Sequence, residues 1–317
     1  MLTTLHSTAQ ERVNREYAID NDFRSACRVT APLGRGALKI GNSFLKTMSS
    51  NMRSESDLAI EEREITSTFD LTKIRVSVIT PATEGHDPLP AILFIHGGGF
   101  VYKGAPYHYR LAKQYALKTK SVVVYVDYRT AHDNLYSVPL LDCQDAWSWM
   151  VRNCGQIGID SSRCAIVGDS AGGFLAINTA LFAAKERLTT PAKMMLIYPV
   201  IDCSMRTESM AQFVDTPVWN SLLNRKMWEY YLQGNNQQSL LDLNCEQLQT
   251  LPQTYIESAE YDCLRDEAEI FATMLSNAGV ATLYTPTKGT MHGFDIAQRS
   301  PITQAQIAAR CKWLSWE

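Results

Sequence analysis

The stretch that decides the fold is CAIVGDSAGGFLAINTALFAA, residues 164–184. Its first five residues form a short apolar run, which is typical of a strand buried on both faces. Residues 173–188 have the composition and spacing of a helix. Between them, residues 168–172 match the G-x-S-x-G pattern, in which a tight strand-to-helix turn presents a serine above the sheet. The stretch therefore predicts a strand–turn–helix unit with Ser170 as candidate nucleophile.

The residues around Ser170 fit that interpretation individually. Gly168 and Gly172 stand two residues before and after the serine, where a side chain would collide with adjacent backbone. Ala171 opens the helix, so its backbone N–H is a candidate donor to a developing oxyanion. Asp169 is assigned a structural role at the site. The alternative, a glycine-rich turn without catalytic meaning, is disfavoured because both the strand and the helix are in place.

Working outward from this unit, strands and helices alternate along the chain. Such alternation predicts an α/β fold with a mostly parallel, doubly wound sheet flanked by helices. Two further segments alternate apolar and polar residues, as an antiparallel pair exposed on one side does. The eight predicted strands are 65–72, 73–81, 91–95, 122–126, 164–168, 194–198, 253–258 and 281–287, and the main helices are 107–119, 140–153, 173–188 and 265–279.

Two segments interrupt the alternation and are predicted to be helical. Residues 1–60 carry helical periodicity, and no strand is expected between residues 198 and 253. We expect one domain over residues 1–317, with a catalytic core of about 61–202 and 241–317 and helical additions of about 1–60 and 203–240. The second addition is rich in large apolar residues, most of which we expect to pack the insertion onto the sheet, while some could line a pocket: Phe213, Trp219, Met227, Trp228, Tyr230 and Tyr231.

A second glycine-rich turn, His96-Gly97-Gly98-Gly99, directly follows the apolar run 91–95. Successive glycines let backbone N–H groups face a ligand without a Cβ in the way. The loop after this strand supplies the remaining oxyanion donors in serine hydrolases of this type. Gly98 and Gly99 are therefore candidate donors, with Gly97 in support. His96 is assigned a structural role, with a hydrogen bond to the backbone of the loop.

His292 is the candidate general base among the six histidines. It lies in KGTMHGF, directly after the last predicted strand, and the triad of such enzymes runs serine, acid, histidine along the chain. His6, His86, His108 and His132 lie in less suitable contexts: the N-terminal stretch, a polar turn, the start of a helix and a loop.

The acid is expected between Ser170 and His292, at the end of a strand. Asp262 follows the strand 253–258 and precedes a helix, where it would hold the imidazole in the required tautomer. Glu260 and Asp202 are rivals for this role. Asp266 and Glu267 have the position of ordinary first-turn acids, which the helix dipole favours.

The composition limits the classes of partner. The net charge of −3 gives no electrostatic reason to expect nucleic acid or an anionic membrane surface. No apolar run reaches the roughly 18 residues of a membrane-spanning helix, and the first residues lack a secretory pattern. The eight cysteines are scattered without a C-x-x-C or metal-ligand spacing. We therefore expect a cytoplasmic protein without metal or cofactor.

Taken together, HGGGF, GDSAGG, D-x-L-R-D-E and H-G-F, in that order, resemble the hormone-sensitive-lipase-like esterases of the α/β-hydrolase superfamily over about residues 90–300. The resemblance implies an α/β-hydrolase fold whose helical cap comes from the N-terminus and a late insertion. It also implies a carboxylesterase for small esters of short acyl chains, without a cofactor. Its motifs place the triad on Ser170, Asp262 and His292, and the oxyanion donors on Gly98, Gly99 and Ala171.

The chain departs from the family pattern in two places. Cys263 stands where the family has proline after the triad acid. Residues 130–133 read Thr-Ala-His-Asp where the family usually has Leu-Ala-Pro-Glu. The second change lies near the catalytic end of the sheet, so we expect it to alter the pocket and not the catalytic residues.

Three alternative functions follow from the same residues. One is another acyl hydrolase on the same triad, such as an amidase, a deacylase or a formamidase. Another is a non-catalytic ligand-binding protein of this fold, which would not need the triad. The third, a lipase for lipid aggregates, would need a large apolar lid, whereas residues 203–240 are mixed in polarity. The strand 281–287 is a candidate edge for pairing two subunits into a homodimer.

Overall fold

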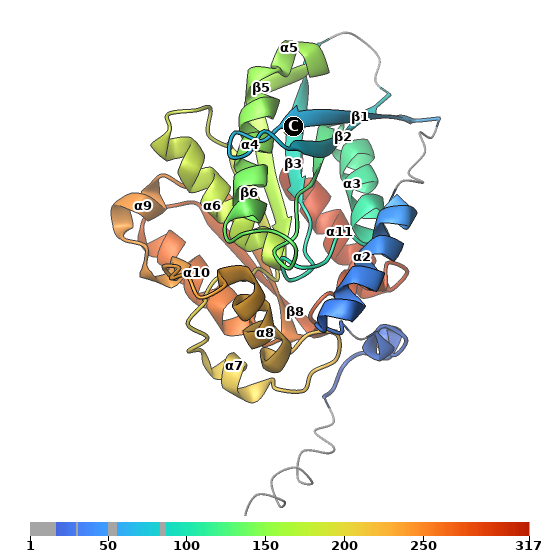
Figure 1. Ribbon diagram of the computed structural model, residues 1–317, viewed down its shortest axis with the longest axis vertical. Helices are drawn as coiled ribbons and strands as arrows, with labels where there is room; N and C mark the ends of the chain where they lie inside the picture. Colours follow the sequence, from blue (N-terminus) through green and yellow to red (C-terminus); the bar gives the residue numbers. More distant parts are fainter. Residues whose placement is uncertain (1–16, 30, 50–55, 83–86, 317) are drawn as a thin grey trace, which may run out of the picture.

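One eight-stranded sheet organises the computed structural model, which describes residues 17–29, 31–49, 56–82 and 87–316 (Figure 1). The strand order is β1-β2-β4-β3-β5-β6-β7-β8. The strands are β1 (Leu58–Thr66), β2 (Lys73–Pro81), β3 (Leu89–Ile95), β4 (Val122–Asp127), β5 (Ile159–Asp169), β6 (Lys193–Ile197), β7 (Gln253–Tyr261) and β8 (Thr282–Met291).

Helices connect the strands and also fill the segments outside the alternation. The α-helices are α2 (Arg35–Ser49), α3 (Pro106–Thr119), α4 (Val138–Arg152), α5 (Cys154–Ile157), α6 (Ala171–Lys185), α7 (Glu208–Gln212), α8 (Ser221–Leu232), α9 (Cys245–Gln249), α10 (Arg265–Asn277) and α11 (Pro301–Leu314). Four single 3₁₀ turns are η1 (Asn21–Phe23), η2 (Ala26–Arg28), η3 (Leu240–Asp242) and η4 (Phe294–Ile296).

The sheet is mostly parallel, which confirms the predicted fold class. β1 pairs antiparallel with β2, and β2 pairs antiparallel with β4. The other five neighbouring pairs are parallel. Two of those pairs determine where the site forms. Ile95 pairs with Gly168 across β3 and β5, and Tyr261 pairs with Met291 across β7 and β8.

The prediction for the first strand was wrong in position. The predicted strand 65–72 is in fact β1 at Leu58–Thr66, followed by a turn over residues 67–72. In that turn the Thr72 N–H donates to the Asp70 carboxylate at 3.1 Å. The strand was missed because residues 61–64 are all charged, which obscures the alternation. Charged side chains are common on edge strands, where they oppose pairing with other chains.

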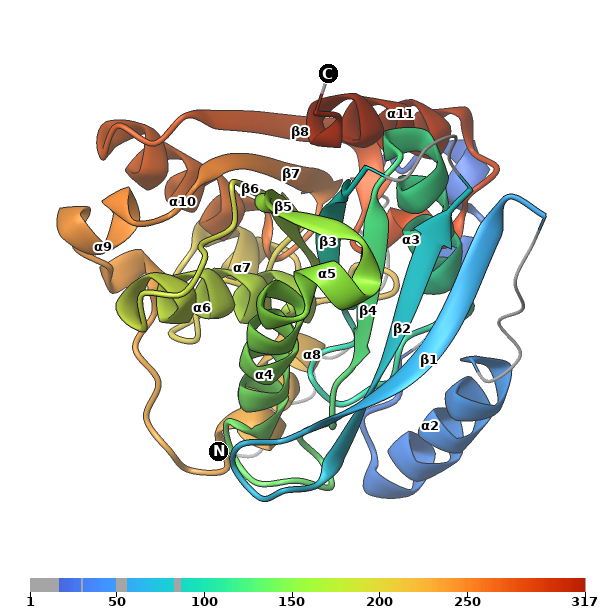
Figure 2. The same cartoon turned by 90° about the horizontal axis from the view of Figure 1, so that it is seen from above.

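Helices cover both faces of the sheet and enclose two apolar cores (Figure 2). Alternate residues of β3 face opposite sides, so Leu93 belongs to one core and Phe94 to the other. The first core lies under α4, α6 and α10, and the second under α3 and α11. Strands with both faces covered read as continuous apolar runs, which is the pattern on which the parallel sheet was predicted.

The two segments predicted as helical additions carry α2 in one case and α7 and α8 in the other. The structure describes all of residues 198–253 and places no strand between β6 and β7 there, as expected. α2 lies beside α3, and its Leu38 reaches the first core (Figure 1). Residues 1–16, 30 and 50–55 of the first segment, with His6 among them, lie outside the described residues, as does His86.

Candidate active site

The turn between β5 and α6 holds Ser170 in a conformation that few residues adopt. Its φ is 53° and its ψ is −122°, and Ala171 is the first residue of α6. A Cβ added to Gly168 would collide with the carbonyl group of Gly172, and a Cβ added to Gly172 would collide with that of Ile95. The tight approach of α6 to β3 and β5 therefore requires both glycines, for the steric reason that the motif predicts.

Ser170, His292 and Asp262 form one hydrogen-bonded line at the carboxyl ends of three parallel strands. The Ser170 Oγ lies 2.8 Å from the His292 Nε2, and the His292 Nδ1 lies 2.7 Å from the Asp262 Oδ2. Asp262 is fully buried, and its other oxygen accepts the Leu264 N–H at 3.0 Å. The pairing of β7 with β8 brings the aspartate and histidine together, since each follows the end of its strand.

The rival carboxylates are engaged elsewhere. Asp202 accepts the Ser204 N–H at 2.9 Å, and Glu260 accepts the Gly289 N–H at 2.6 Å. Asp266 accepts the Ser209 N–H at 2.7 Å. Glu267 is fully buried and accepts the Ile201 N–H at 2.7 Å, so it is more than the ordinary first-turn acid that its sequence position suggested.

The glycine-rich turn after β3 faces Ser170 across a cavity. Gly98 and Gly99 have φ values of 118° and 59°, which residues with a Cβ rarely adopt, and both line the cavity. The Gly98 carbonyl accepts the N–H groups of Val101 and Tyr102, which closes the turn. The Gly97 N–H donates to the Asp169 Oδ1 at 3.0 Å and is therefore already engaged.

Asp169 and His108 join the two glycine turns, a pairing that sequence reasoning missed. The His108 Nε2 lies 3.0 Å from the Asp169 Oδ2, and the His108 Nδ1 accepts the Ala105 N–H at 2.8 Å. With Nδ1 accepting, the ring proton lies on Nε2 and points to the carboxylate. The acidic residue inside GDSAG was the only local signal, and its partner comes from another helix.

His96 lies beneath the turn, where its ring is fully buried. It stacks on Tyr128 with ring centroids 4.3 Å apart, and its Nδ1 lies 2.6 Å from the Gly97 carbonyl oxygen. Burial lowers the pKa of His96 to about 3, and the neighbouring His108 adds to that shift. His96 is therefore neutral at physiological pH, and it packs under the turn away from the cavity.

The cavity beside Ser170 has a volume of about 470 Å³. Its walls come from Val29, residues 31–32, the helix α2, the glycine turn, the start of α3 and the segment before α8. The lining is mainly apolar apart from Ser170, His292, His108 and Lys103. Its large apolar and aromatic members include Val29, Pro32, Ala37, Phe44, Leu45, Tyr102, Tyr107, Val218, Trp219 and Ile296.

Trp219 closes one side of this cavity. Its ring centroid lies 6.0 Å from that of His292, and a Cβ added to Gly99 would lie 2.7 Å from the Trp219 ring. The preceding Val218 has a φ of 66°, a strained value for a β-branched residue. Of the six large apolar residues singled out in the insertion, all of them described, only Trp219 lines this cavity. Phe213, Met227, Trp228 and Tyr231 are buried in the first core.

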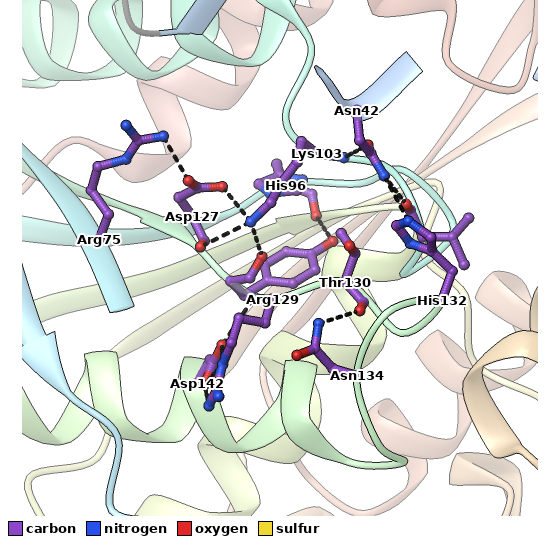
Figure 3. A network of polar contacts seen from close by, with 12 residues as sticks. Asn42, Arg75, His96, Lys103, Asp127, Arg129, Thr130, His132, Asn134 and Asp142 are labelled. Carbon is purple, nitrogen blue, oxygen red and sulfur yellow. Dashed lines mark hydrogen bonds and ion pairs between the residues drawn. The ribbon is translucent and has the colours of Figure 1, made fainter. Parts of the chain in front are cut away.

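The divergent loop 130–133 contributes no residue to the walls of this cavity. Figure 3 shows its His132 beside Asn42. The Ala131 N–H donates to the Phe100 carbonyl at 2.8 Å. The His132 Nε2 lies 3.5 Å from the Asn42 Nδ2 of α2 and 2.9 Å from the Asp133 carboxylate. The loop thus contacts the glycine-rich turn without lining the cavity.

The described part of the chain has neither the side-chain grouping of a metal site nor a membrane-spanning helix. It contains no cluster of three or more histidine, cysteine or acidic side chains arranged to hold a metal ion. None of its helices is long and apolar enough to cross a membrane. All eight cysteines are free thiols, and the cytoplasmic location stays a prediction.

Comparisons with known proteins agree with this geometry. A family model described as alpha/beta hydrolase fold matches residues 92–296. Carboxylesterase NlhH of Mycobacterium tuberculosis is 30% identical over 75% of this chain and 76% of its own length. Ethyl acetate hydrolase of Pseudomonas putida is 32% identical over 75% of each chain. The crystal structure of a thermostable esterase from Pseudomonas putida ECU1011 superposes with a TM-score of 0.85 at 27% identity, covering 95% of this chain and 98% of the other.

Proposed function

The chain belongs to the α/β-hydrolase family, among its hormone-sensitive-lipase-like esterases, and from this we propose that it hydrolyses short-chain carboxylic esters with Ser170 as nucleophile. Its relatives are named as a carboxylesterase and an ethyl acetate hydrolase, and the chain is an ester hydrolase of the serine type. The assignment of the catalytic residues and the preference for short acyl chains are the proposed part.

The observation that carries the proposal is the line from Ser170 to His292 to Asp262. The distances of 2.8 and 2.7 Å suit proton transfer from the serine to the imidazole and a stabilising bond from the carboxylate. Asp262 is buried and held by the Leu264 N–H, so it fixes the His292 tautomer that leaves Nε2 free to accept the serine proton.

In the acylation step, His292 takes the Ser170 proton as the serine oxygen attacks the ester carbonyl carbon. The tetrahedral oxyanion would then be held by the backbone N–H groups of Gly98, Gly99 and Ala171. Collapse of this intermediate expels the alcohol, to which His292 returns the proton, and leaves an acyl-enzyme on Ser170. Water activated by His292 then releases the acid by the same steps.

The preference for short acyl chains rests on the shape of the cavity. Trp219 stands against Gly99 and His292, which narrows the space next to the nucleophile on that side. Elsewhere the cavity is open and apolar, with room for a small ester group. We propose that α2 and the segment 203–240 act as the cap of this cavity, since residues 37–45 and 218–219 both line it.

The test is hydrolysis of p-nitrophenyl esters of increasing acyl length by the wild type, Ser170→Ala and Ser276→Ala. Ser276 is exposed at the end of α10 and serves as the matched control. We expect highest kcat/KM on acetate to butyrate, and a loss of about 10⁴-fold or more in kcat only for Ser170→Ala. Activity that survives in Ser170→Ala would reject the nucleophile. A wild type inactive on every ester but active on p-nitroanilides would favour an amidase.

A further inference from the structure

The oxyanion turn contains three successive residues with left-handed backbone. Gly98, Gly99 and Phe100 have φ values of 118°, 59° and 61°. Phe100 is not a glycine, so its conformation costs about 1 kcal/mol or more. Such a segment persists only when surrounding contacts fix it. The proposed oxyanion donors, the Gly98 and Gly99 N–H groups, lie on this segment. The direction in which these N–H groups point therefore depends on the contacts that fix the segment.

The hydrogen bonds that fix this turn come from two directions. Inside the turn, the Gly98 carbonyl accepts the N–H groups of Val101 and Tyr102 at 3.1 and 2.8 Å. Outside it, the Asn42 side chain on α2 binds two backbone groups at once. Its Nδ2 donates to the Val101 carbonyl at 2.8 Å, and its Oδ1 accepts the Lys103 N–H at 2.8 Å.

We propose that Asn42 is a positioning residue for the oxyanion hole. Its amide spans Val101 and Lys103 as a neighbouring strand would, with one donor and one acceptor, and anchors the exit of the turn to α2 (Figure 3). The Lys103 side chain is anchored in turn, because its Nζ binds the Asp127 carboxylate at 2.8 Å and the Tyr128 carbonyl at 2.7 Å.

The same helix also faces the substrate cavity. Ala37, Gly41, Phe44 and Leu45 of α2 line the cavity beside Ser170. A Cβ added to Gly41 would lie 3.1 Å from the Tyr102 ring, so α2 packs closely on the turn as well. One helix therefore lines the cavity proposed for the substrate and also contacts the outer side of the oxyanion turn. The inference rests on the proposed function, since it concerns the same site.

The experiment compares Asn42→Ala and Asn42→Asp with Asn134→Ala. Asn134 is a matched control because its amide belongs to the adjacent loop and donates to the Thr130 carbonyl at 2.8 Å. Removal of one oxyanion donor lowers kcat by about 10²–10³-fold. A change in the direction of the donor N–H groups should therefore lower kcat by about tenfold or more. We expect Asn42→Ala to lose about tenfold or more in kcat on p-nitrophenyl acetate with KM changed by less than about twofold. Asn42→Asp keeps the acceptor for Lys103 but turns a carboxylate oxygen towards the Val101 carbonyl, so it should also lose kcat.

A second measurement distinguishes misplaced oxyanion donors from a general loss of protein stability. A trifluoromethyl ketone adds to Ser170 and places an oxyanion in the hole, whereas an uncharged alcohol such as benzyl alcohol occupies the cavity without one. The inhibition constant of the ketone should rise in parallel with the loss of kcat, while that of the alcohol stays within about twofold. Thermal unfolding of each variant checks that it is folded at the assay temperature.

The proposal is overturned if both Asn42 variants match Asn134→Ala in kcat and in ketone binding. It is also overturned if KM rises while kcat stays unchanged, because that pattern means α2 only binds substrate. A failure of the proposed function looks different: the wild type would then show no turnover of the ester and no inhibition by the ketone that depends on Ser170.

Discussion

Trp219 is the residue that we propose limits the acyl range of the site. It is 5% exposed, and its Nε1 lies 3.3 Å from the Asn224 Oδ1, which holds the ring against Gly99 and His292. The left-handed Val218 before it keeps the chain at the angle that presents the ring. A ring that is hydrogen-bonded on one side and packed on the other cannot easily move. Because this ring lies beside Ser170, we expect it to limit the length of the acyl chain that fits.

We therefore expect Trp219→Ala to shift the preference towards longer acyl chains. Each methylene admitted to an apolar space contributes about 0.8 kcal/mol, so two methylenes should raise the ratio of kcat/KM for butyrate over acetate by about tenfold. The measurement is a p-nitrophenyl ester series on the variant and on Leu222→Ala, an exposed residue of α8 as control. If the variant instead changes only the preference for the alcohol part of the ester, the acyl group lies on the side of the cavity away from Trp219.

At the scale of elements, Glu267 fastens the start of α10 to the segment after β6. Its side chain is fully buried and accepts the Ile201 N–H, so the helix that begins just after Asp262 is tied to a neighbouring strand end. Burial raises the pKa of Glu267 well above its usual value. The hydrogen bond from the Ile201 N–H lowers this pKa, and the charge of Asp202 raises it further. The carboxyl therefore keeps its proton to a higher pH in the folded protein than in the unfolded chain.

This raised pKa gives a pH-dependent cost to stability. Above the unfolded pKa of about 4.3 the unfolded chain releases a proton that the folded chain keeps, so stability falls as pH rises towards the folded pKa. Glu267→Gln retains the acceptor for Ile201 and removes that dependence. We expect the difference in Tm, variant minus wild type, to become more positive from pH 5 to pH 8. The exposed Glu269→Gln on the same helix is the control, and a difference independent of pH would contradict the expectation.

At the scale of the whole molecule, a buried ionic cluster connects α11 to the turn that carries His292. Arg310 of α11 is fully buried and binds both oxygens of Glu257 on β7 at 2.7 and 2.9 Å. It also binds Asp295, three residues after His292, at 2.9 Å. Tyr198 donates to the same Asp295 at 2.7 Å and places its ring 4.9 Å from that of His292.

Arg310→Met should therefore destabilise the whole fold and not only α11. Removing one partner of a buried ion pair leaves uncompensated charge, which costs about 3–5 kcal/mol. Urea unfolding should show this loss, and kcat should fall because the turn that carries His292 loses its anchor. Arg299→Met, an exposed arginine just before α11, is the control. A loss below about 1 kcal/mol would mean that the cluster does not hold the fold together.

The quaternary state is a second property of the whole molecule. β8 forms one edge of the sheet, and its Leu283 is 49% exposed, so an apolar residue lies on a strand with a free edge. We predict a homodimer formed by pairing of these edges. Light scattering should give twice the chain mass for the wild type and the single chain mass for Leu283→Lys. A wild-type monomer would refute the prediction.

The nucleophile turn could be predicted from sequence because its constraints are local. Gly168 and Gly172 are required by backbone contacts within the strand–turn–helix unit, and Ser170 is placed by the same unit. The order of strands and helices could also be predicted from sequence, because strands that are buried on both faces consist of continuous apolar residues. Asp262 and His292 followed from their position at strand ends, although only the pairing of β7 with β8 brings them within 2.7 Å.

The remaining features were decided by contacts between residues far apart in the chain. Asn42 reaches Val101, His108 reaches Asp169, and Arg310 reaches Glu257, and no local pattern marks any of these pairs. The burial of Glu267 likewise depends on the segment after β6, whereas its sequence position suggested an ordinary helix start. Sequence therefore determined the chemistry, because steric rules act between near neighbours. The tertiary structure decided which residues position the site and which residues surround it, because these hydrogen bonds and ion pairs form only when distant segments of the chain come together.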